Sequence, residues 1–230
     1  PHLVYITEGA ANDMVVLPQL ELAQGSIVIM DRGYRNYQKY KEWSEQQITF
    51  ITRHRPYTYV RLLHDIEVEP QEVEKGVLAD EIVQLGHPAK KNRKVRVRLI
   101  TFSDATSDRQ FEFVTNDFET PPSSIAALYK KRWSIELLFK RLKQNMPLKY
   151  FLGDNQNAVK IQIYCALISD LLLQIIQKLV RRKWAFSNVA ALVRLHLFNY
   201  INLISFLKNP EKCKMTFSVL DPQLKLNLSG

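Results

Sequence analysis

One fifteen-residue stretch, Tyr129 to Lys143, constrains this 230-residue chain more than any other. It contains no Gly or Pro, is filled by strong helix formers and follows Pro121-Pro122-Ser123-Ser124, which predicts a helix start with a serine cap. We therefore predict one unbroken helix up to about residue 144. At about 100° per residue, four of its polar residues share a stripe roughly 60° wide. These residues are Tyr129, Arg132, Glu136 and Lys143.

The apolar residues of this helix occupy a separate arc, which predicts a buried face made of Leu128, Ile135, Leu138, Phe139 and Leu142. A single carboxylate, Glu136, then lies among cations at the edge of that face. Two interpretations are open. The helix is either a basic amphipathic helix with an internal salt bridge, or a place where a carboxylate and several cations meet one ligand.

The charge of the chain favours a polyanionic partner. The net charge is +9 and the sequence pI is near 9.5, while 46% hydrophobic and 24% charged residues are typical of a globular protein. Residues 129–150 hold seven Lys or Arg and one acid, whereas residues 64–85 hold seven acids and one Lys. Cations placed on phosphates release counterions, so DNA is a natural partner. A generally basic protein without such a partner is the alternative.

A second carboxylate, Asp31, follows an apolar stretch that predicts a strand, Ser26–Met30. The carboxyl ends of strands are where open α/β sheets bind ligands. We predict a polar helix from Tyr34 to about Glu45 after it. The alternative for Asp31 is a turn former or helix cap.

The remaining chain divides into a β-rich part and a helical part. Strands are predicted at residues 2–7, 48–53, 58–63, 94–102 and 110–115, and helices at 13–22, 157–182 and 184–207. In Lys94–Leu99 apolar residues alternate with cations, which predicts either a basic face that grips DNA or a half-solvated sheet. Polar residues interrupt the apolar run Ile161–Val180, so we predict a core helix and no membrane span.

Several blocks resemble the insertion-sequence-4 family of DDE transposases, and its Bacteroides-type members in particular. The helix reproduces that family's tyrosine, arginine, glutamate, lysine signature at Tyr129, Arg132, Glu136 and Lys143. The other blocks occur in the family's order and cover nearly the whole chain: Ile29–Tyr34, Phe50–Arg53, Val114–Asp117, Phe151–Asp154 and Asn157–Val159.

The resemblance implies an α/β fold with a ribonuclease-H-like catalytic core, a β-rich insertion and a helical C-terminal region. The implied division is 1–46 for the first part of the core, 47–117 for the insertion, 118–208 for the rest of the core and 209–230 for a tail. It also implies that Asp31 and Glu136 are catalytic metal ligands. Tyr129, Arg132 and Lys143 would contact the transposon end, and we add Lys140 and Arg53 as candidate DNA contacts.

Phosphodiester chemistry near neutral pH is helped by divalent ions held by about three carboxylates. The cofactor that we expect is therefore magnesium or manganese. The family's first aspartate has no counterpart in this sequence, and Asp13, the nearest substitute, opens a predicted helix. We expect this chain by itself to lack a complete metal site and to be inactive or badly impaired.

The function that we predict is metal-dependent strand cleavage and strand transfer at insertion-sequence ends. The expected partners are the DNA of the element's ends and of the target, and a second copy of the chain in a dimeric synaptic complex. Two cysteines and no signal peptide favour a cytoplasmic, nucleoid-associated protein. Two alternatives stay open: a non-catalytic DNA-binding remnant of a transposase, and a stand-alone ribonuclease-H-like nuclease.

Overall fold

The computed structural model describes residues 6, 16–87, 89, 94–146, 148, 150–153, 155–199 and 201–212. The chain forms two compact units, Pro1–Leu137 and Leu138–Gly230, which are described separately. The predicted strand at 2–7 and the predicted tail lie almost wholly outside the described residues. Of the predicted helix at 13–22, the described part contains only a 3₁₀ turn, Leu17–Gln19.

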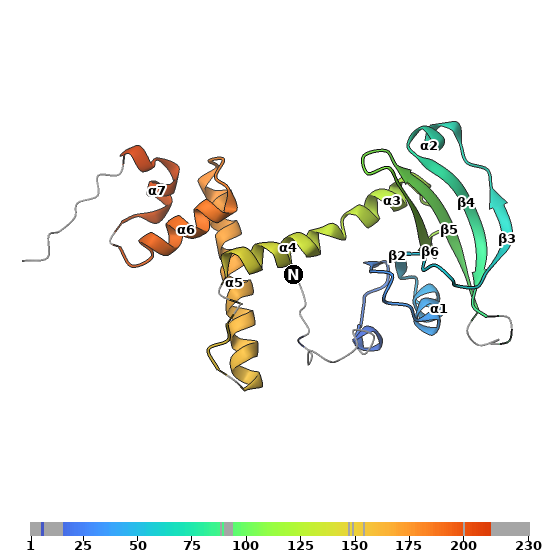
Figure 1. Cartoon of the computed structure of the whole chain (residues 1–230), viewed down its shortest axis with the longest axis horizontal. Helices are drawn as coiled ribbons and strands as arrows, with labels where there is room; N and C mark the ends of the chain where they lie inside the picture. Colours follow the sequence, from blue (N-terminus) through green and yellow to red (C-terminus); the bar gives the residue numbers. More distant parts are fainter. Residues whose placement is uncertain are drawn as a thin grey trace, which may run out of the picture. The chain divides into compact units, whose positions relative to one another are not determined.

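The first unit is built on one six-stranded mixed sheet (Figure 1). Its strands are β1 (Ile27–Ile29), β2 (Thr49–Arg53), β3 (Val60–Ile66), β4 (Val77–Leu85), β5 (Val95–Asp104) and β6 (Arg109–Thr115). Their order across the sheet is β1-β2-β6-β5-β4-β3. β1 and β2 are parallel, and every other neighbouring pair is antiparallel. The carboxyl ends of β1 and β2 therefore meet at the same edge.

Alternation along the strands sends successive side chains to two different cores. Phe50 packs with Tyr40 and Trp43 of helix α1 (Tyr37–Glu45), whereas Ile51 packs with residues of helix α3 (Pro122–Lys130). In the same way, Val114 and Leu99 pack in the core with Phe50, whereas their neighbours Phe113 and Ile100 pack in the core with Ile51. The sheet is consequently covered by α1 on one face and by α3 on the other.

Sequence reasoning missed two elements, β4 and the short helix α2 (Pro70–Glu74). Both lie in the acidic segment 64–85, where the charged residues obscure the strand pattern. β4 nevertheless lies inside the sheet, between β3 and β5. β1, from the predicted core, lies in the same sheet as the strands of residues 47–117. The division of the chain into a core and a β-rich insertion stays a prediction.

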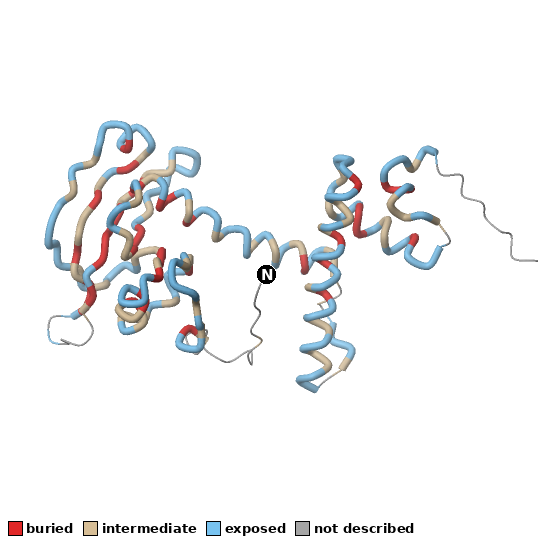
Figure 2. The backbone as a smooth tube through the Cα atoms, turned by 180° about the vertical axis from the view of Figure 1, so that it is seen from behind, coloured by how far each residue is buried: buried red, intermediate tan, exposed pale blue. Residues whose placement is uncertain are grey.

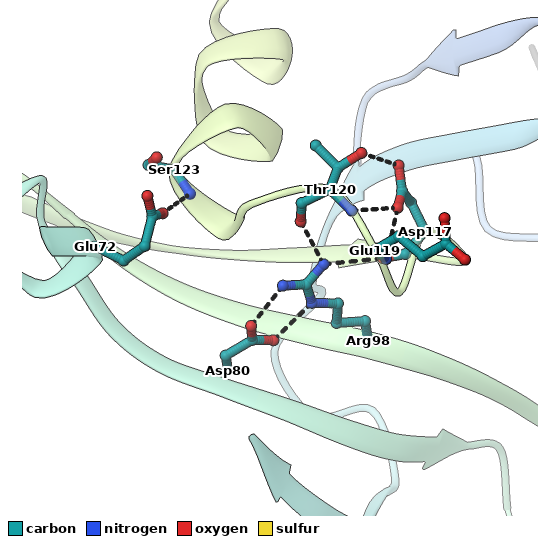
Figure 3. A network of polar contacts seen from close by, with 7 residues as sticks. All are labelled: Glu72, Asp80, Arg98, Asp117, Glu119, Thr120 and Ser123. Atoms are coloured by element: carbon teal, nitrogen blue, oxygen red, sulfur yellow. Dashed lines mark hydrogen bonds and ion pairs between the residues drawn. The ribbon is translucent and has the colours of Figure 1, made fainter. Parts of the chain in front are cut away.

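The predicted cationic face of β5 is wrong for Arg98, which is buried in a polar network (Figure 3). Arg98 donates from Nε to Asp80 Oδ1 at 2.8 Å and from Nη2 to Oδ2 at 2.6 Å. Its Nη1 donates to the carbonyl oxygens of Asp117, at 3.2 Å, and Thr120, at 2.6 Å. The network ties β4 and β5 to the loop before α3.

That loop is held by two further side chains of the block Val114–Asp117. Asn116 accepts from Phe50 N at 2.8 Å and donates to Ile48 O at 2.9 Å, so it bridges to β2. Burial raises the pKa of Asp117, but hydrogen bonds from Thr120 and Glu119 outweigh this and lower it overall. Both residues are therefore structural.

Helix α3 begins without the serine cap predicted from the sequence, since its N-cap residue is Pro121. The cap comes instead from α2: Glu72 Oε2 accepts from Ser123 N at 2.8 Å (Figure 3), and Glu72 Oε1 accepts from Lys75 Nζ at 2.7 Å. The hydrogen bond from Lys75 is the main reason that the pKa of Glu72 is lowered to about 2, with the bond from Ser123 adding to it.

We predict that Glu72 makes the stability of this unit sensitive to acid. Its folded-state pKa lies below the unfolded value, so its contribution is complete above about pH 4.5 and disappears as the pH falls towards about 2. We expect Glu72→Gln to lower the free energy of unfolding by about 1–2 kcal/mol at pH 7 and by much less at pH 3. Chemical denaturation at the two pH values measures this. An equal loss at both would contradict it.

The single helix predicted around residues 129–143 is two helices, α3 and α4 (Trp133–Asn145). They are separated at Lys131 and Arg132, where Arg132 N donates to Tyr129 O and Ile135 N to Arg132 O. The predicted buried face is also wrong in part. Leu142 is buried, but Ile135 and Phe139 are 48% and 56% exposed. Figure 2 shows buried residues on α3 giving way to exposed ones along α4.

The second unit contains the end of α4 and helices α5 (Gln156–Val180), α6 (Phe186–His196) and α7 (Leu203–Lys208). Asp170 of α5 is buried and accepts from Arg141 Nε at 2.5 Å and Nη2 at 2.7 Å. Leu173, Val189 and Leu207 belong to the small cores between these helices.

Most of α5 is exposed, contrary to the prediction of a core helix. Only four of its residues are buried: Ala166, Asp170, Leu173 and Val180. In the part of the chain that the structure describes, α5 is the one helix whose length and apolar composition would allow it to cross a membrane. The core helix of a globular protein can have the same length and composition, so these two properties are weak evidence for a membrane span.

Candidate active site

Asp31 lies just beyond β1, at the sheet edge where β1 and β2 end. Met30 N donates to Ile51 O at 3.0 Å, so the pairing with β2 continues to the residue before Asp31. The backbone then turns, with Asp31 O accepting from Tyr34 N at 3.0 Å. The Asp31 side chain is exposed. The predicted placement of this carboxylate after a strand is therefore correct.

The residues of the signature helix make a short chain of contacts. Arg132 Nη1 donates to Glu136 Oε1 at 2.6 Å, and the Arg132 guanidinium lies 5.6 Å from the centre of the Tyr129 ring. Three buried polar atoms have no hydrogen-bond partner among the described residues: Tyr129 Oη, Arg132 Nε and Glu136 Oε2. The internal salt bridge of the simpler interpretation is present, yet it leaves polar groups unsatisfied, as binding sites often do.

The electrostatics of Tyr129 connect Asp31 to this group. Burial raises the pKa of the Tyr129 phenol, the positive charges of Arg132 and Arg53 oppose the rise, and the negative charge of Asp31 adds to it. Such interactions are strong only over short distances. The charges of Asp31, Arg53 and Arg132 therefore all act on one side chain, although these residues are far apart in the sequence.

Arg53, Tyr129 and Arg132 also line one cavity of about 640 Å³. Arg53 stacks over the Phe111 ring at 4.8 Å. Sequence reasoning missed most of the other residues of this cavity, among them Arg109, Phe111 and Lys130. Lys130 Nζ lies 3.3 Å from Oδ1 of Asp104, a carboxylate that also lines the cavity. Alternating cations and aromatic rings are typical of surfaces that bind nucleic acid, and Arg109-Gln110-Phe111 carries that signal in the sequence.

Lys140 and Lys143 belong to the second unit. Both are exposed. Their proposed contacts with DNA stay predictions, as does the meeting of the two carboxylates on one ion.

The donor chemistry of Asp31 and Glu136 fits part of a divalent-ion site. Carboxylate oxygens suit magnesium or manganese, and Glu136 Oε2 is a shielded oxygen without a partner among the described residues. Within the described residues, no three His, Cys, Asp or Glu side chains lie together in an arrangement that would hold a metal ion. Asp13 falls outside the described part.

Comparison with known families gives an independent result. The model of a family described as "Transposase DDE domain" matches residues 1–171. Among curated proteins, the transposase named y4zB of Sinorhizobium fredii is 32% identical over 182 residues, which cover 79% of this chain and 51% of the relative.

Two further relatives are named as transposases of insertion sequences. The one for element IS5377 of Geobacillus stearothermophilus is 29% identical over 76% of this chain and 45% of its own length. The one for element IS4SA of Synechocystis is 31% identical over 68% of this chain and 43% of its own length. The chain thus spans about half the length of the curated relatives that it matches.

Proposed function

Because the chain belongs to the family of transposases with a DDE domain, we propose that it is part of the catalytic domain of an insertion-sequence transposase. The protein would cut DNA at the ends of its element and join the freed ends to a target. The observation that carries the proposal is the cavity lined by Arg53, Tyr129 and Arg132, in which Arg132 forms an ion pair with Glu136. The signature further supports membership of the insertion-sequence-4 family and a Bacteroides-type sequence.

Asp31 and Glu136 would hold a divalent ion, with a third ligand from another part of the protein. When bound, such an ion activates the phosphodiester and lowers the pKa of the attacking water. Hydrolysis leaves a 3′ hydroxyl and a 5′ phosphate. The hydroxyl then attacks a target phosphodiester, forms a new P–O bond and releases the target's own 3′ oxygen.

The cationic residues would hold the phosphate during these steps. The guanidinium of Arg132 can donate two parallel hydrogen bonds to phosphate oxygens, and it stabilises the charge that develops there. Its ion pair with Glu136 keeps it oriented in the absence of DNA. Arg53 would contribute a second guanidinium from the end of β2, while Lys143 and Lys140 would act as point charges on DNA phosphates.

The parallel pair β1 and β2, with Asp31 beyond β1, supports a ribonuclease-H-like core. We further propose that two copies act together on DNA ends in the nucleoid. The Arg132–Glu136 salt bridge favours a second candidate, a DNA-binding remnant without catalysis, because one oxygen of Glu136 is already occupied.

The DNA contact of Tyr129 can be tested by removing its hydroxyl. Because Tyr129 Oη is buried and interacts with Arg132 without a hydrogen bond of normal geometry among the described residues, Tyr129→Phe should change the free energy of unfolding by less than about 1 kcal/mol. We expect the affinity for an insertion-sequence end to fall about tenfold, measured by fluorescence anisotropy.

The matched control is Tyr59→Phe, at a residue that is 48% exposed and lies just before β3. This change should leave both quantities unchanged. Unaltered DNA affinity in Tyr129→Phe would exclude the proposed contact, and a wild-type protein that bound no DNA would contradict the proposed function itself.

A further inference from the structure

A second cationic cavity lies at the edge of the sheet where β1 and β2 end. It is small, about 20 Å³, and it is formed by the segments that follow these two parallel strands. Four arginines line it: Arg32 and Arg35 after β1, and Arg53 and Arg55 at and after the end of β2. None of the lining residues, all of which the structure describes, is an Asp or a Glu. We call this cavity the arginine cup.

The arginine cup gathers positive charge. Its four arginines repel one another, and solvent screens this repulsion because Arg32, Arg35 and Arg55 are exposed. Arg35 is held in place by a hydrogen bond from Nη1 to Thr58 Oγ1 at 3.3 Å and lies 5.8 Å from the Tyr37 ring centre. A bound anion would remove this repulsion.

Four residues that line the cup each carry a buried polar atom without a partner in the described part of the chain. Tyr37 Oη, Thr52 Oγ1, Arg53 Nε and His54 Nε2 are all buried and have no hydrogen-bond partner among the described residues. Thr52 is only 4% exposed. The other ring nitrogen of His54 is already paired, with Nδ1 2.6 Å from Glu112 Oε2. Four orphan atoms around one cavity are unusual, because buried polar groups are nearly always paired.

We propose that the arginine cup binds a phosphate of the DNA backbone. This proposal rests on the proposed function, because it adds a contact with DNA outside the signature helix. The hydroxyl groups and guanidiniums of the residues that line the cup can donate hydrogen bonds to phosphate oxygens, and the arginines match the charge of a phosphodiester. A volume of about 20 Å³ admits roughly one or two phosphate oxygens, not a base. Asp31 lies at the same edge of the sheet. A DNA strand bound in the arginine cup would therefore run past this predicted catalytic carboxylate.

Two variants test the arginine cup by different means. Arg35→Gln removes a rim charge, so the affinity for duplex DNA should fall about tenfold and the salt dependence should weaken by about one phosphate contact. Thr52→Val removes a buried hydroxyl without changing the charge. Its DNA affinity should fall about fivefold with an unchanged salt slope and no loss of thermal stability.

The control is Arg61→Gln, which removes an exposed charge on β3 from a residue that does not line the cup. Equal effects of Arg35→Gln and Arg61→Gln, together with no effect of Thr52→Val, would overturn the proposal, because the loss would then be general electrostatics. A second arm uses inorganic phosphate, which should raise the melting temperature of the wild type but not of Thr52→Val.

The two arms separate the possible sources of phosphate. Loss of the phosphate effect with normal DNA binding would overturn the DNA assignment and indicate a site for free phosphate. A wild type that bound no DNA would contradict the proposed function, while the phosphate arm would still decide whether the cup binds anions.

Discussion

Replacing Glu136 by glutamine is expected to lower the rate of DNA strand cleavage by at least about 10³-fold. The amide keeps the size of the side chain but removes the charge that would hold a divalent ion, and such an ion contributes several kcal/mol to phosphodiester cleavage. Asp31→Asn should have an effect of similar size. Because the two changes act on one ion, the double variant should be little worse than either single variant.

The measurement is cleavage of a labelled duplex carrying the insertion-sequence end, in magnesium, by the complete protein that contains this chain. Glu74→Gln, an exposed carboxylate on α2, is the control and should retain normal activity. DNA affinity should remain within about threefold of wild type in all variants, since neither carboxylate binds the phosphate directly. Full activity in Glu136→Gln would exclude Glu136 as a metal ligand. A wild type that bound the DNA without cleaving it would instead favour the DNA-binding remnant.

Replacing Arg98 by methionine is expected to destabilise the first unit by about 3–5 kcal/mol. The change leaves the Asp80 carboxylate, which is 3% exposed, as an uncompensated buried charge. It also removes the donor to the carbonyl oxygens of Asp117 and Thr120, which hold the loop before α3. Chemical denaturation followed by circular dichroism measures this loss.

Two further variants test whether the loss of stability comes from the buried pair of Asp80 and Arg98. Arg96→Met removes an exposed cation two residues earlier on β5 and should cost less than about 1 kcal/mol. The double variant Asp80→Leu with Arg98→Met should recover much of the lost stability, because an apolar pair needs no compensating charge. A cost below about 1 kcal/mol for Arg98→Met would show that the network contributes little.

The sequence predicted most of the individual elements of the fold. An apolar stretch before Asp31 became β1, the polar segment after it became α1, and alternating residues became β2, β5 and β6. These predictions succeed because the apolar period of a strand or helix is local information. β4 was missed for the same reason, since acidic residues interrupt its pattern and only the neighbouring strands show why it belongs in the sheet.

The sequence named individual residues of the candidate site, but it did not show which charged groups lie together. Helical spacing placed Glu136 four residues from Arg132, which the salt bridge confirms. The spacing gave no sign that the helix is interrupted at Lys131 and Arg132, because local propensity there favours helix throughout. The arginine cup was not foreseen either. Its arginines are divided between residues 32–35 and 53–55, and nothing local brings two such segments together.

From its residues alone, this chain was determined to be basic, mixed α/β and similar to DDE transposases, because charge, period and motif order are written along the chain. Only the tertiary structure determined which charged residues form buried ion pairs and which stay exposed. Arg98 and Arg96 are equivalent in the strand pattern, yet one is buried against Asp80 and the other is exposed. Pairing depends on which distant segments the sheet brings into contact. That choice is made by packing over the whole unit and by no single stretch of sequence.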